Sequence, residues 1–301
     1  MARELIYLAI LDGVSYAALL FLVALGMTLV FGVMNIINMA HGSFYAFGGY
    51  LAATFGGWAI AAGLSPAWSF LLLPLAAVLV GTVLGGLMEI TLLKRIYNKD
   101  PILQLLITFS TFMIFEDLQR MIWGTQPYFV SELVKYTGVV DVMDITYTRY
   151  QLFILPSVAL VAFLALRYFL RSSRTGRQIV AVAHNREVST ALGINVRKIC
   201  LLTFIVASML GALGGALASQ TTSWVPGIGA DMIVLSFAVV ATAGLGQIEG
   251  ALVAALMIGL ARSFAVYLFP EIEVLVPYLI MVLVLLFRPQ GLFSVAQARR
   301  V

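Results

Sequence analysis

The sequence predicts an all-α polytopic membrane protein with about eight or nine transmembrane helices. Of its 301 residues, 62% are hydrophobic and 11% are charged, whereas soluble domains have about 45–50% apolar and about 25% charged residues. Several apolar runs reach the roughly 20 residues that a helix needs to cross a hydrocarbon core. Backbone polar groups in lipid must be hydrogen-bonded within the protein, so we expect these runs to be helices. These runs account for most of the chain and leave no room for a separate soluble domain, so we expect a single transmembrane domain over residues 1–301.

The composition also excludes several kinds of site. A single cysteine, Cys200, allows neither an internal disulfide nor a cysteine metal cluster, and the two histidines lie far apart in sequence. The chain lacks the G-x-x-x-x-G-K-[ST] phosphate loop and any nucleophile–base pairing, so we expect no ATP site, catalytic residue, cofactor or metal in it. The net charge of +4 reflects basic loops beside a lipid bilayer, and it predicts no nucleic acid partner.

The first two spans are expected over residues 7–33 and 44–62. Asparagines, a histidine and a glycine interrupt the apolar sequence between them. This pattern is typical of a broken helix or re-entrant turn, which is tolerated only where protein or a water-filled cavity surrounds it. An ordinary surface loop explains it equally well, and the choice decides which side holds the N-terminus. The pathway candidates from this interruption are Asn35, Asn38, His41 and Gly42.

The third and fourth spans are expected over residues 67–93 and 101–123, joined by a basic loop. The fourth carries Glu116, Asp117 and Arg120, whose spacing of three and four residues places them on one helix face. Ionisable groups in a span are functional candidates. Structural pairing at the outer membrane interface is the simpler interpretation.

The loop over residues 124–149 has no basic bias and is expected outside the cell. The remaining spans are expected over residues 151–170, 200–220, 232–243, 251–269 and 274–287, and the last of them brings Arg288, Arg299 and Arg300 inside. A glycine-rich turn over residues 244–250 mirrors the break in the first half, a pattern expected where two halves unwind around a central pathway. Gly244 and Gly246 are therefore further pathway candidates.

The segment over residues 171–198 is a polar island that holds six of the chain's 18 basic residues and one acid, Glu187. Two short pieces in it have helical apolar spacing, namely Ile179/Val182/Ala183 and Val188/Ala191/Leu192, and Gly193 is placed to end the second. Topology alone explains a basic cytoplasmic loop. Amphipathic helices within such a loop indicate a docking element, so we expect a cytoplasmic coupling loop.

Three stretches then carry a resemblance to a known family. They are GVMNIINMAHGSFYAFGGYLA over residues 32–52, GRQIVAVAHNREVSTALGINVRK over residues 176–198 and VVATAGLGQIEGALVAALMIGL over residues 239–260. In this order they resemble LivH-type permease subunits of ABC importers for branched-chain amino acids. The chain departs from the family at Gly246-Gln247-Ile248-Glu249-Gly250, where G-S-I-P-G is the common pattern, and at Arg262, where an acid is often found. Branched-chain or other amino acids, amides, urea and aromatic acids are therefore all open as solutes.

The resemblance implies the ABC importer permease fold and alternating access in the inner membrane of a bacterium or archaeon. It implies a second permease, LivM-type or identical, two ATPase subunits that bind ATP and Mg²⁺, and a periplasmic or extracellular solute-binding protein. The segment that resembles the family's coupling loop includes Gly176, Arg177, Ala183, Val188, Ala191, Leu192, Gly193, Ile194 and Asn195.

Two other classes of transporter compete with this interpretation. An ion-coupled secondary transporter would use Glu116, Asp117 and Arg120 as its relay and would work without an ATPase. A passive channel would need no docking loop. The amphipathic basic segment favours an ATPase-coupled subunit over both.

Overall fold

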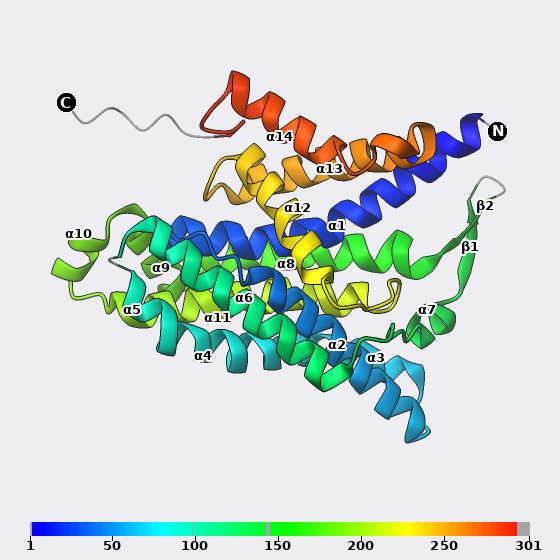
Figure 1. Ribbon diagram of the computed structural model, residues 1–301, viewed down its shortest axis with the longest axis horizontal. Helices are drawn as coiled ribbons and strands as arrows, with labels where there is room; N and C mark the ends of the chain where they lie inside the picture. Colours follow the sequence, from blue (N-terminus) through cyan, green and yellow to red (C-terminus); the bar gives the residue numbers. More distant parts are fainter. Residues whose placement is uncertain (1, 98, 143–144, 294–301) are drawn as a thin grey trace.

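The computed structural model describes residues 2–97, 99–142 and 145–293, and Arg299 and Arg300 lie outside these residues. The described chain is mostly helical, as predicted (Figure 1). A short antiparallel hairpin was not predicted: β1 (Val139–Val142) pairs with β2 (Ile145–Thr148) in the loop expected outside the cell.

The helices follow the predicted runs closely. In the first half they are α1 (Ala2–Met34), α2 (His41–Ala61), α3 (Ser69–Leu79), α4 (Gly86–Met88), α5 (Lys94–Ile96), α6 (Pro101–Trp123) and α7 (Glu132–Thr137). In the second half they are α8 (Leu155–Ser172), α9 (Arg174–His184), α10 (Arg186–Ala191), α11 (Val196–Ala218), α12 (Ile228–Ala243), α13 (Ile248–Leu268) and α14 (Val276–Phe287). Short 3₁₀ turns lie at Pro66–Trp68 and Pro270–Ile272, and π-helical turns at Val80–Gly85, Glu89–Leu93 and Tyr150–Ile154.

Six described helical rods are long and apolar enough to cross a membrane, which makes the chain a multi-pass membrane protein. Four of them are the single helices α1, α6, α11 and α13. The other two are the rod from Pro66 to Ile96, which contains α3, α4 and α5, and the rod from Tyr150 to Ser172, which contains α8. Helices α12 and α14 are apolar but shorter. The predicted number of eight or nine spans is therefore not confirmed.

The molecule has two distinct ends (Figure 1). We call the end with α5, α9 and α10 the docking end, and the end with α7, β1 and β2 the hairpin end. Helix α1 begins at the hairpin end, where the Asp12 carboxylate accepts hydrogen bonds from the hydroxyls of Tyr147 in β2 and Tyr267 in α13. Helix α1 ends at the docking end beside α10. The N-terminal end of the chain therefore lies at the opposite, hairpin end (Figure 1).

Helices α1, α2 and α11 pack against one another at the centre of the molecule. Small residues let their backbones approach closely. A Cβ atom on Gly215 of α11 would lie 1.8 Å from the carbonyl oxygen of Tyr45 in α2, so this contact requires glycine. Gly81 and Gly85 likewise pack against Met209 and Ser208 of α11.

Candidate functional site

The chain breaks between α1 and α2, and the break is not a surface loop. Asn35 turns the chain with a φ of 57°, in the left-handed region that asparagine tolerates better than most residues. Ile36 and Asn38 are then only 1% and 2% exposed. His41 begins α2 with its Nε2 atom 3.2 Å from the carbonyl oxygen of Val23. Val23 lies about three turns, or roughly 16 Å, before the end of α1, so the chain runs back into the protein before α2 starts.

His41 is packed tightly at this inner start of α2. A Cβ atom on Gly26 of α1 would lie 2.9 Å from its Nε2 atom, and one on Gly211 of α11 would lie 3.0 Å away. The imidazole therefore fills a slot that two glycines leave open. The His41 side chain is fully buried.

The start of α12 meets the start of α2 inside the molecule. A Cβ atom on Gly42 would lie 2.2 Å from the carbonyl oxygen of Gly229, so the two first turns are in direct backbone contact. Near this contact, Asn38 Nδ2, His41 Nδ1 and Ser43 Oγ are buried without a hydrogen-bond partner in the part of the chain that the structure describes. Buried polar atoms without partners cost free energy, so such a cluster is a candidate for contact with a polar solute or water.

Residues 171–198, which we call the docking segment, contain the two helices that the sequence predicted. Ser173 Oγ accepts a hydrogen bond from the Gly176 amide at 2.8 Å and caps α9, while Asn185 Oδ1 accepts one from the Val188 amide at 3.0 Å and caps α10. Gly193 follows α10 with a φ of +80°, as expected for a glycine that ends a helix.

The apolar faces of these two helices differ in burial. Ile179 and Val182 of α9 are 2% and 1% exposed, because α9 packs against α1, α8 and α11. Val188 and Leu192, in and just after α10, are 53% and 75% exposed. The first predicted face therefore attaches the loop to the spans through Ile179 and Val182, and the second face is exposed.

The other predicted coupling residues are distributed around these helices. Gly176 packs against the backbone of Phe169 and Leu170. Ile194 is half-buried. The exposed residues are Arg177, Ala183, Ala191 and Asn195. Asn195 Oδ1 accepts a hydrogen bond from the Lys198 amide at 3.1 Å and so caps α11.

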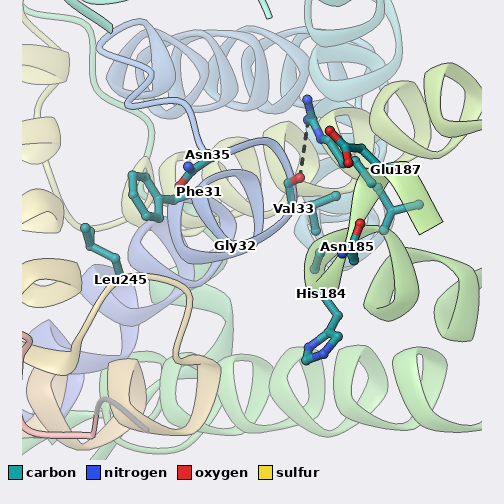
Figure 2. Close-up of a pocket in the computed structure, with 11 residues that line it drawn as sticks. Phe31, Gly32, Val33, Asn35, His184, Asn185, Glu187 and Leu245 are labelled. Atoms are coloured by element: carbon teal, nitrogen blue, oxygen red, sulfur yellow. Dashed lines mark hydrogen bonds between the residues drawn. The ribbon is translucent and has the colours of Figure 1, made fainter. Parts of the chain in front are cut away.

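A cavity of about 550 Å³ brings the docking segment and the break together (Figure 2). Asn35, the end of α1 and Leu245 lie on one side, and the junction of α9 and α10 lies on the other. Gly246 packs against Gly32 beside it, while Gly244 packs against Gly291. Seven of the lining residues were not predicted as site residues: Phe31, Val33, His184, Asn185, Arg186, Glu187 and Leu245.

Glu116, Asp117 and Arg120 lie on one face of α6, as predicted. Arg120 contacts Glu116 at 2.7 Å and Asp117 at 3.4 Å. The side chains of Asp117 and Arg120 are 72% and 47% exposed, and exposed ion pairs of this kind contribute little to stability. The arrangement fits structural pairing near the end of a helix. In addition, no three metal-binding side chains gather among the described residues.

Known proteins match the chain over nearly its whole length. The sequence model described as "Branched-chain amino acid transport system / permease component" matches residues 9–285. The high-affinity branched-chain amino acid transport system permease protein LivH of Escherichia coli is 26% identical, with all of both chains aligned. BraD of Pseudomonas aeruginosa, named as the same kind of permease, is 26% identical over 97% of each chain.

An archaeal relative extends this range. The probable branched-chain amino acid transport permease protein LivH of Methanocaldococcus jannaschii is 28% identical over 95% of this chain and 92% of its own length. No solved structure matches the chain significantly. The chain belongs to the family of permease components of branched-chain amino acid transport systems.

Proposed function

We propose that this chain carries branched-chain amino acids into the cytoplasm as a permease subunit of an ATP-driven importer. The observation that carries this proposal is the outward apolar face of α10, in a chain that belongs to this permease family from end to end. The names of the relatives point to branched-chain amino acids as the solute. Other amino acids, amides, urea and aromatic acids are the competing solutes.

The partners follow from this role. ATP and Mg²⁺ would bind to two ATPase subunits, and α10 would dock on one of them. A second permease, LivM-type or identical, would complete the transmembrane unit, and a solute-binding protein would deliver the solute. Basic residues concentrate at the docking end, which favours a cytoplasmic position for residues 171–198 in the inner membrane of a bacterium or archaeon. Residues 1–301 would then form one transmembrane permease domain.

The starts of α2 and α12 are our candidates for the solute pathway. Asn38, His41 and Gly42 lie at this contact, where the unpartnered polar atoms gather. Asn35, Gly244 and Gly246 border its approach from the docking end, beside the cavity. Movement of α2 away from α12 would expose these polar atoms to a passing amino acid, as alternating access requires.

Reconstitution of the full complex in liposomes tests the proposal. Leucine uptake should require ATP inside and binding protein outside, and it should persist when ionophores collapse the ion gradients. A non-hydrolysable ATP analogue is the matched control. Unlabelled isoleucine and valine should compete with leucine more strongly than alanine, acetamide, urea or benzoate. Uptake by the permease alone that follows an ion gradient would overturn the proposal and would restore the relay of Glu116, Asp117 and Arg120.

A further inference from the structure

Arg186, the first residue of α10, reaches across to the end of α1. Its Nη2 atom donates hydrogen bonds to the carbonyl oxygens of Val33 at 3.3 Å and Met34 at 3.4 Å (the dashed line in Figure 2 ends on Val33). The last carbonyls of a helix have no partner within it and carry the negative end of its dipole. A guanidinium group therefore suits this position in both hydrogen bonding and charge.

The same side chain contacts two further spans. Its guanidinium carbon lies 5.3 Å from the centre of the Tyr97 ring, at the end of the rod that contains α3 to α5. The Tyr97 hydroxyl donates a hydrogen bond to Glu89, and burial together with this hydrogen bond raises the pKa of Tyr97, so the ring stays uncharged. Arg186 Nη2 also lies 3.6 Å from the sulfur of Cys200 in α11.

These contacts place Arg186 between the outward-facing helix and the break that leads to α2. Val33 and Met34 come directly before Asn35, where the chain leaves α1 and turns inward. A displacement of α10 would pull on these two carbonyls through charge-assisted hydrogen bonds, which are stronger than neutral ones.

We propose that Arg186 is the positioning residue through which movement of the docking helix α10 reaches the end of α1 and the break that begins at Asn35. This inference rests on the proposed function, because it assumes that an ATPase moves α10. It predicts that loss of the positive charge that donates to the carbonyls of Val33 and Met34 separates ATP hydrolysis from transport and leaves docking intact.

The test compares Arg186→Gln and Arg186→Lys with Arg95→Gln in the reconstituted complex. Arg95 is exposed in α5 at the same end, so its substitution removes one positive charge outside the contacts described above. In Arg186→Gln we expect normal assembly and ATPase activity, but about tenfold less leucine moved per ATP. Arg186→Lys should recover much of the wild-type ratio, because an ammonium group can also donate to both carbonyls. Wild-type transport per ATP in Arg186→Gln would overturn the inference.

A second measurement serves if Arg186→Gln does not assemble. Cys200 is the single cysteine of the chain and is 1% exposed beside Arg186, so its alkylation rate reports whether this contact opens. Mass spectrometry of this chain in the wild-type complex should show a several-fold difference in that rate between the nucleotide-free and vanadate-trapped states. Equal rates would overturn the inference.

The two proposals fail in different ways. Wild-type complex that shows no ATP-dependent uptake contradicts the proposed function. ATP-dependent uptake that Arg186→Gln leaves fully coupled contradicts only the role of Arg186.

Discussion

At the scale of single residues, glycines decide how closely the central helices pack. Gly215 of α11 lies against the backbone of Tyr45, which cannot move aside as a flexible side chain can. Gly86 of α4 is also buried, but a Cβ atom there would lie 3.6 Å from the end of the Ile205 side chain, which is ordinary contact. The same substitution should therefore have different effects at the two positions.

We predict that Gly215→Ala lowers the thermal stability of the purified permease and that Gly86→Ala does not. The clash at Gly215 must push α2 and α11 apart, and overpacking typically costs about 1–3 kcal/mol. At Gly86 the alanine should be neutral or slightly stabilising, because alanine has the higher helix propensity. Thermal unfolding in detergent measures both. Equal melting temperatures for the two variants would contradict the close contact between α2 and α11.

The sequence predicted correctly those features that depend on a few neighbouring residues. Gly193 adopts the left-handed backbone expected of a residue that ends a helix, and Asn35 interrupts the chain where polar residues were noted. The contacts of Arg186 had no such signal. They join residues 152 and 153 positions apart, and a sequence read segment by segment does not reveal which distant carbonyl an arginine meets.

At the scale of elements, the periodicity of the docking segment predicted both helices but not the direction of their faces. An apolar face indicates that a helix packs on something, without indicating whether that is its own chain or another. The structure separates the two cases, since Val182 of α9 is buried and Leu192 after α10 is 75% exposed. Leu192 is the most exposed large apolar side chain of the docking segment, and Val180 of α9 is exposed as well.

We predict that Leu192→Asp prevents the ATPase from co-purifying with the permease, while the permease itself remains folded. A charge placed in an apolar contact loses its hydration without gaining a partner. Leu64→Asp is the matched control, because Leu64 is 45% exposed and lies in the turn after α2, which ends away from the docking end. Co-purification should survive that change. Full ATPase recovery with Leu192→Asp would contradict the docking role of this face.

At the scale of the whole molecule, hydropathy predicted the helices well and their arrangement poorly. The span expected over residues 101–123 coincides with α6, because both of its ends carry local signals: Asp100 caps its start and Gly124 follows its end. Burial of α2 at the centre depends on contacts with α1 and α11. The hairpin of β1 and β2 was also missed, since two strands of four residues in a polar loop give little periodic signal.

The structure also decides which loop shares a side with the N-terminus, which the sequence left open. Helix α1 starts beside β2 and ends beside α10, so a single crossing separates the first residues of α1 from the docking segment. The basic residues at the docking end favour the cytoplasm for that end. If the docking end is cytoplasmic, the start of α1 and the hairpin both lie outside.

We predict that a cysteine at Tyr136 reacts with a membrane-impermeant thiol reagent in intact cells, whereas a cysteine at Thr190 reacts only after permeabilisation. Tyr136 of α7 is 56% exposed at the hairpin end, and Thr190 is exposed in α10. The native Cys200 is 1% exposed and should react little with the reagent. Labelling of the chain without an added cysteine measures this background. An ATPase-bound α10 would shield Thr190 as well, so permeabilised cells that lack the ATPase separate shielding from sidedness. If both positions react from outside, α7 and α10 lie on the same side of the membrane. In that case α10 cannot be the element on which a cytoplasmic ATPase acts.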